Sequence, residues 1–190
     1  LIVCGVILWV LGLSLPITAS YLVAVPTVAP ALIGLGIPAA AAHMFIFYYA
    51  VLSEVSPPVA LSPFAAAAIT GGDPYKTMMV TWKYALPAFL VPFMFTQPNG
   101  IAMLLRDTTP IDAIVATVSA AVGITALVTG VGGYLFRRAS LVQRAILVVA
   151  GLLLLSPNEI GDALGLALFA AAAGWQILAA RRPADRPAAT

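Results

Sequence analysis

The stretches LSLPITAS at residues 13–20 and SEVSPPV at residues 53–59 decide the fold, because each interrupts a long apolar run with hydroxyls and proline. Proline lacks a backbone N–H and clashes with the preceding turn, so each stretch ends a helix and leaves carbonyl and N–H groups without partners. At membrane depth such backbone has to be buried in protein or to line a wet cavity, as in the broken helices of secondary transporters. We interpret both stretches as helix breaks inside a bilayer and the chain as part of a secondary transporter.

The composition around these stretches is that of an integral membrane protein. Of the 190 residues, 62% are hydrophobic and 8% are charged, whereas a soluble domain carries about 25% charged residues. Residues 1–53 contain no Asp, Glu, Lys or Arg, and residues 111–136 contain only Asp112. Both runs exceed the roughly 20 residues that a spanning helix needs. The single cysteine, Cys4, excludes an internal disulfide and gives no metal-ligand spacing.

Residues 1–33 are expected to form a re-entrant helical hairpin with its tip at Pro16. The arm before the break spans about 20 Å at 1.5 Å per residue, which is too short for a hydrocarbon core of about 30 Å. Both arms would therefore lie on one side of the membrane midplane. The alternative is one long helix that crosses the membrane with kinks at Pro16, Pro26 and Pro30.

Residues 39–70 are expected to form a discontinuous transmembrane helix that stops after residue 53 and resumes at residue 59. A break about 22 Å from the start of a helix lies inside the hydrocarbon region for ordinary tilts. The apolar runs and turn residues divide the rest into a helix at residues 74–95 bent at Pro87 and Pro92, an outer loop at 98–110, additional transmembrane helices within 111–180 and a disordered cytoplasmic tail at 181–190. The predicted fold is an all-α integral membrane protein in which residues 1–97 form one unit.

Positive charges indicate the orientation of the chain. They lie in segments that successive crossings bring to one side, at Lys76, Arg137, Arg138, Arg144, Arg181, Arg182 and Arg186. By the positive-inside rule that side is cytoplasmic, which predicts a multi-pass protein with a cytoplasmic C-terminus. The hairpin would then dip from the outer side, although the charge pattern also permits a full crossing by residues 1–33. Because the chain opens on Leu1 without a basic flank, we expect it to be the C-terminal piece of a longer polypeptide.

The residues at the two breaks are the candidate binding groups. Helix N-termini attract anions, whereas free carbonyls and hydroxyls suit a bare cation such as Na⁺. Ser14 and Ser56 are expected to cap the helices that follow them. The alternative for each hydroxyl is a bond back to its own helix or across to a neighbouring helix. The candidates are Gly12, Ser14, Thr18, Ser20, Ser53, Ser56 and Pro57.

Glu54, beside the second break, is the one acid that the sequence places at membrane depth. An ionised carboxylate there is costly unless it is paired or wetted, which makes Glu54 a functional candidate. Three roles stay open: a ligand of the coupling ion, a proton carrier, or a structural acceptor of backbone N–H groups. His43 is expected nearer the outer interface, where an amphipathic ring needs no special role.

The segments PITASYLVAV at residues 16–25 and AHMFIFYYAVLSEVSPPVAL at residues 42–61 resemble the C-terminal half of TRAP transporter large permease subunits. The resemblance is closest to the fused type, in which small and large membrane subunits form one polypeptide that is often paired with a TAXI-type solute-binding protein. It covers residues 1–97. The helices within residues 111–180 are similar to the C-terminal extension of that fused group.

This resemblance implies an elevator-type importer of organic anions in a bacterial or archaeal cytoplasmic (inner) membrane. Na⁺ or protons would drive it, and an extracytoplasmic solute-binding protein would deliver a carboxylate substrate. In that family the outer-facing hairpin and the broken helix form half of an inverted-repeat transport domain and hold one cation and half of the substrate site. Mapped here, the cation ligands would be Gly12, Ser14, Thr18, Ser53, Ser56 and Pro57, and the substrate ligands would be Ser14, Thr18, Ser20 and Ser56. The remainder of the permease polypeptide would complete the site.

Two other functions are compatible with the residues alone: a channel-like pore lined by the breaks, or a non-transporting helical scaffold subunit. The sequence contains no phosphate-binding loop, zinc spacing or Ser-His-Asp set, so we expect neither an enzyme nor a nucleic-acid partner. No cofactor is expected besides Na⁺ or H⁺ as the coupling ion, and no metal besides Na⁺. The lipid bilayer is the remaining partner.

Overall fold

The computed structural model describes residues 1–97, 109–156 and 158–181. Within these residues the secondary structure is helical and contains no strand, apart from one isolated bridge between Tyr134 and Arg138. In this part of the chain four helices are long and apolar enough to cross a membrane, namely Ile17–Gly34, Pro74–Phe95, Pro110–Gly132 and Ile160–Leu178. The prediction of an all-α, multi-pass membrane protein is therefore confirmed.

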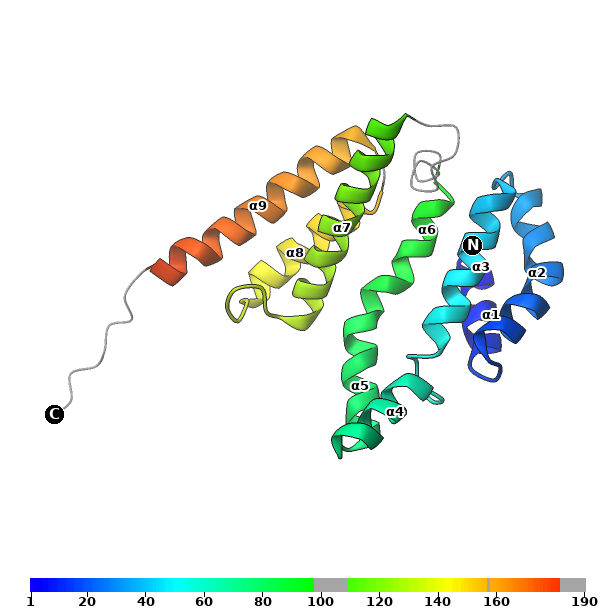
Figure 1. The fold of residues 1–190 in the computed structure, drawn as a ribbon. Helices are drawn as coiled ribbons and strands as arrows, with labels where there is room; N and C mark the ends of the chain where they lie inside the picture. The colour runs from blue at the N-terminus through cyan, green and yellow to red at the C-terminus, as the bar shows by residue number, and fades with distance from the viewer. Residues whose placement is uncertain (98–108, 157, 182–190) are drawn as a thin grey trace.

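The first break separates α1 (Ile2–Gly12) from α2 (Ile17–Gly34). The two helices turn back on each other, and both pack against α3 (Ala39–Ser53), as Figure 1 shows. α2 continues through Pro26 and Pro30 as a helix, so the reversal occurs at the predicted break and not at the later prolines. The alternative of one long kinked helix is excluded.

The second break separates α3 from α4 (Leu61–Thr70). α4 begins two residues later than the sequence predicts, because Ala60 adopts a left-handed conformation with φ of 40° that helical residues do not share. α4 ends at Gly71, whose φ of 70° is readily adopted by glycine.

A further column of helix runs from Pro74 to Phe95. It consists of α5 (Pro74–Ala85), the 3₁₀ turn η1 (Leu86–Leu90) and α6 (Val91–Phe95). Asp73 caps the column by accepting a hydrogen bond from the Lys76 N–H at 2.8 Å. The 3₁₀ turn contains Pro87, which lacks the N–H needed for the α-helical bond.

Aromatic side chains of α3 form the core between this column and the hairpin. Phe45 is fully buried and packs edge-on against Phe93 of α6. The hydroxyl of Tyr49 donates to the carbonyl oxygen of Phe89 at 3.0 Å. This core fixes the position of α3. Because the second break begins at the end of α3, the core also fixes the position of that break.

The last three helices are α7 (Pro110–Gly132), α8 (Leu141–Leu154) and α9 (Glu159–Arg181). Figure 1 shows them side by side, with α5 and α6 between them and the hairpin. Glycines bring α7 and α8 close together: a Cβ at Gly151 would lie 2.8 Å from the carbonyl oxygen of Gly123. The expected outer loop lies almost entirely outside the described residues, as does the expected tail after residue 181.

Candidate functional site

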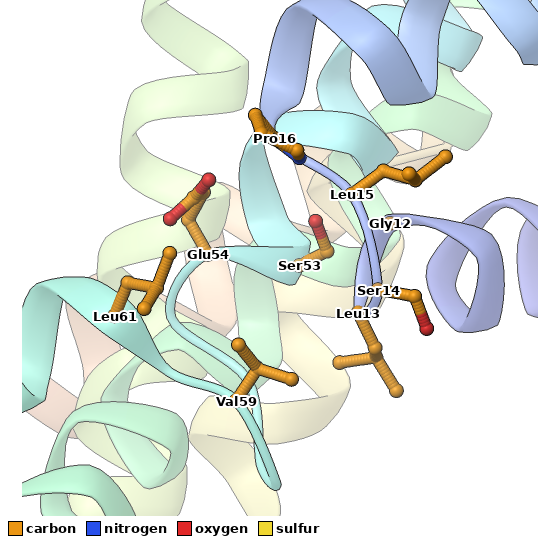
Figure 2. A pocket seen from close by; sticks show the side chains of 9 residues that line it. All are labelled: Gly12, Leu13, Ser14, Leu15, Pro16, Ser53, Glu54, Val59 and Leu61. Atoms are coloured by element: carbon orange, nitrogen blue, oxygen red, sulfur yellow. The ribbon is translucent and has the colours of Figure 1, made fainter.

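The two helix breaks meet around one cavity of about 100 Å³. Figure 2 shows the side chains that surround it. The first break and the second break both contribute to the lining, which consists of Gly12, Leu13, Ser14, Leu15, Pro16, Ser53, Glu54, Val59 and Leu61. The fold thus brings together two stretches that are almost 40 residues apart in the sequence, counted from Pro16 to Glu54.

Ends of opposite polarity converge on this cavity. α1 and α3 end at it with their carbonyl ends, at Gly12 and Ser53, while α2 and α4 start beside it with their N–H ends, at Ile17 and Leu61. The close approach of α1 to α3 depends on glycine, because a Cβ at residue 12 would lie 2.6 Å from the Cβ of Ser53. The cavity is therefore bordered by partial negative charge from two helix ends and partial positive charge from two others.

The carbonyl oxygen of Gly12 is free of backbone donors within the described residues. The donor that would continue the helix lies four residues on, where Pro16 has no N–H. Pro57 bears the same relation to Ser53, but there the carbonyl oxygen accepts a hydrogen bond from the Ser56 N–H at 3.1 Å. A strongly polar, unpaired acceptor thus lies on the α1 side of the cavity.

The starts of α2 and α4 supply free donors. The N–H groups of Ile17, Thr18 and Ala19 donate to no carbonyl in the described part of the chain, and the same holds for Leu61 and Ser62. Neither helix start has a side-chain cap. Free N–H groups at a helix start bind anions such as carboxylates.

The predicted capping by Ser14 and Ser56 is wrong. Pro16 and Ala60 occupy the positions before α2 and α4, and neither offers a side-chain acceptor. Ser56 remains in a tight turn that continues α3, where its hydroxyl donates to the carbonyl oxygen of Leu52 at 2.7 Å. The sequence showed the residue type that caps helices but not that the turn would extend the preceding helix.

Three of the candidate hydroxyls are buried and bond back to nearby carbonyls. Ser20 donates to Leu15 at 3.0 Å, and Ser53 donates to Ala50 at 2.7 Å. Ser56, described above, is the third; the exposed fractions of Ser20, Ser53 and Ser56 are 1%, 1% and 0%. Their hydroxyl protons are committed to the backbone, so only the oxygen lone pairs remain for a ligand.

The remaining candidates divide between the cavity and its surroundings. Glu54 is half-buried and lines the cavity, where Figure 2 shows its carboxyl group on the side of Pro16. Ser14 is exposed and also lines it, but its hydroxyl points away from the side on which Glu54 lies. Thr18 is exposed, and the lining does not include it.

The structure thus brings four sequence candidates to the cavity, namely Gly12, Ser14, Ser53 and Glu54. It leaves Thr18, Ser20, Ser56 and Pro57 outside the lining. The sequence predicts free N–H groups after each break, but it does not assign them to Ile17 and Leu61. For α2 the signal was present, because Pro16 marks where a helix can start; for α4 the left-handed Ala60 gives no such signal.

Comparison with known proteins identifies one family. Residues 1–98 match the family model described as "Tripartite ATP-independent periplasmic transporter, DctM component". No curated protein and no solved structure matches the chain. The matched segment contains both breaks and the cavity, whereas α7, α8 and α9 lie outside it.

Proposed function

The chain belongs to the DctM family of tripartite ATP-independent periplasmic transporters, and on that premise we propose that its cavity holds the coupling cation and receives the carboxylate of an organic anion. The family consists of secondary-transporter permeases, which favours coupled transport over a channel-like pore or a passive scaffold. The single observation that carries the proposal is the convergence of the two breaks on one cavity.

The cation is held from the α1 and α3 side. The free carbonyl oxygen of Gly12 and the carboxylate of Glu54 supply negative charge, and the carbonyl ends of two helices add to it. No lysine or arginine lines the cavity within the described residues. Na⁺ or a proton on Glu54 would neutralise this charge, and the coupling ion is one of these two.

The carboxylate substrate is held from the α2 and α4 side. The free N–H groups of Ile17, Thr18 and Ala19 are oriented as in other helix N-termini that bind anions. Ser14, in the lining, and Thr18, outside it, are both exposed, and their hydroxyls would contact the part of the substrate that lies beyond the cavity. Buried Ser20 and Ser56 keep the hairpin tip and the second break in shape through their backbone bonds.

The size of the cavity indicates what it can hold. Its volume of about 100 Å³ suffices for a cation with one or two waters, since a water occupies roughly 30 Å³ of liquid. Sites for whole small molecules are larger, at roughly 300–1,000 Å³. The body of the substrate therefore extends beyond this cavity, and other parts of the permease complete its site.

The full mechanism that we propose is import by an elevator movement. An extracytoplasmic solute-binding protein, of the TAXI type if the permease is of the fused kind, delivers the anion. Cation binding steadies the hairpin tip against α3, and the loaded transport domain then moves across the cytoplasmic (inner) membrane. In this arrangement the C-terminus is cytoplasmic, and α7, α8 and α9 form a C-terminal extension.

Thermal unfolding of the purified complete permease tests the cation site. A ligand that binds only the folded state stabilises it by an amount that grows with the ratio of ligand concentration to Kd, so we expect a higher Tm in NaCl than in KCl of equal ionic strength, or a Tm that rises on acidification. Glu54→Gln should abolish the effect of NaCl or reduce that of acid, and Asp112→Asn, which changes an acid outside the cavity, should leave both unchanged. Ion effects that are as large in Glu54→Gln as in the unmodified protein, or no response to either ion, contradict the proposal.

A further inference from the structure

The turn between α8 and α9 lies part-way along α7 and not beyond its end. α8 has 14 residues and α7 has 23, so α8 covers about 21 Å beside a helix of roughly 35 Å. Contacts fix the register: a Cβ at Gly123 of α7 would lie 2.9 Å from the Cβ of Leu154, the last residue of α8. The turn is therefore level with the part of α7 near Ser119, about 14 Å from the start of that helix.

Asp162 and Ser119 meet at this level. The side chain of Asp162, near the start of α9, lies beside that of Ser119 of α7, which is 6% exposed. The Oδ1 atom of Asp162 is buried and has no hydrogen-bond partner within the described residues. Both side chains belong to helices long enough and apolar enough to cross a membrane. We infer that Asp162 is a second acid at membrane depth besides Glu54.

The charged groups on the surrounding helices do not neutralise this carboxyl. On α7, Asp112 lies about two turns before Ser119 and accepts a hydrogen bond from Thr109. On α8, Arg144 lies near the opposite end and donates to the carbonyl oxygens of Gly130 and Val131.

Two more ionisable groups belong to the neighbouring elements. Lys83 of α5 lies over the ring of Tyr84, which contacts α7 at Gly132, the end remote from Ser119. The side chain of Glu159, in the first turn of α9, lies outside the described part. Arg144 and Lys83 are thus engaged elsewhere and do not pair with Asp162.

An ionised carboxylate in this position lacks sufficient compensation. The partial positive charge at the start of α9 and one neighbouring hydroxyl offset only part of the loss of hydration at membrane depth. A metal ion would need more oxygen ligands than a carboxyl and a hydroxyl. The neighbouring Asn158 Oδ1 already accepts the Gly161 N–H at 2.6 Å, and the Ser156 carbonyl oxygen accepts the Asn158 N–H at 2.8 Å. A proton is the ligand that fits.

We propose that Asp162 is a proton-binding site between α9 and α7, separate from the cavity at the two breaks. Its carboxyl group holds a proton while α9 is packed on α7. On release the O–H bond breaks, the proton passes to a water molecule that enters at the turn of Ser156 and Asn158, and the electron pair stays on the carboxylate. The charged carboxylate then draws water between the helices, so the packing of α9 depends on pH.

Infrared difference spectroscopy of the purified complete permease tests this site. A protonated carboxyl group has a C=O stretching band that disappears on ionisation, so spectra are recorded between acidic and alkaline buffer. We expect a titrating band that is lost in Asp162→Asn and retained in the matched control Asp112→Asn. Ser119→Ala should shift the band, because it removes the polar group that lies beside the carboxyl group.

Each result decides the proposal. A difference spectrum that is the same in Asp162→Asn and the unmodified protein overturns it. Where Asp162→Asn does not fold, an unshifted band in Ser119→Ala overturns it. Loss of the whole titrating band in Glu54→Gln assigns the proton to the cavity at the breaks, which overturns the Asp162 site and leaves the proposed transport function intact. If Tm does not respond to Na⁺ but the infrared band is lost in Asp162→Asn, the proposed cation site fails and the Asp162 site is supported.

Discussion

Gly12 of α1 lies in direct contact with Ser53 of α3, and this contact joins the two helix breaks. A Cβ at residue 12 would overlap the Ser53 hydroxyl and lie 2.6 Å from its Cβ. Both residues are buried, and both are the last residues of their helices. Because the helix ends touch, their carbonyl ends border one cavity and not two separate ones.

Gly12→Ala should therefore destabilise the fold by about 1–3 kcal/mol, the usual effect of overpacking a tight contact. The control is Gly34→Ala, because a Cβ at Gly34 meets no atom within 4 Å. Denaturant unfolding of the purified permease measures both. The double variant Gly12→Ala/Ser53→Gly should recover part of the loss, since the second change makes room for the new methyl group. Equal stability of Gly12→Ala and Gly34→Ala would show that the contact is not constrained.

Tyr21→Phe should weaken the attachment of the hairpin to α3. The Tyr21 hydroxyl and the Nδ1 atom of His43 are 2.7 Å apart and form a hydrogen bond between α2 and α3. Loss of one such bond reduces the free energy of unfolding by about 0.5–1.5 kcal/mol. Tyr75→Phe is the matched control, because Tyr75 is 70% exposed. If both variants unfold at the same denaturant concentration, the hydrogen bond adds nothing to stability.

Arg144→Lys should destabilise the last three helices although it conserves the charge. The Arg144 guanidinium donates from Nε to Gly130 at 2.8 Å and from Nη2 to Val131 at 3.0 Å, which satisfies carbonyls at the end of α7. A lysine ammonium does not reproduce this planar two-point contact. We expect a loss of about 1–2 kcal/mol in unfolding free energy, against little change for the exposed Arg138→Lys. A loss as small as that of Arg138→Lys would argue against the role of Arg144 as a helix cap.

Proline chemistry made the main features of the fold predictable from the sequence. Pro16 and Pro57 each remove the donor that would continue a helix, and the chain breaks at both places. The later prolines Pro26 and Pro30 lie within α2, because an apolar helix packed against a neighbour tolerates the missing bonds. The start of α4 was missed because the left-handed conformation of Ala60 has no sequence signature.

In contrast, the sequence does not predict at which level neighbouring helices pack against each other. The level of Asp162 along α7 follows from the short α8 and from the contact of Gly123 with Leu154, and neither changes the local pattern around the aspartate. The hydroxyl of Ser56 could likewise cap the following helix or donate to a carbonyl of the preceding one. It donates to Leu52, because the turn after α3 extends that helix. That the breaks meet depends on the Gly12–Ser53 contact, which is a long-range feature.

The accessibility of Ser14 should report cation binding at the hairpin tip. Ser14 is exposed and lines the cavity, so in a Cys4→Ala background a Ser14→Cys variant offers one reactive thiol there. If a cation steadies the tip against α3, the open conformations become less populated, and a small thiol reagent should react several-fold more slowly with Na⁺ or at lower pH. A cysteine thiol reacts more slowly at lower pH, because less of it is thiolate. The labelling rate of Ile69→Cys in α4, at a position 86% exposed, is therefore the reference for each condition. A ratio of the two labelling rates that is the same with Na⁺, with K⁺ and across pH would mean that no coupling ion orders the tip.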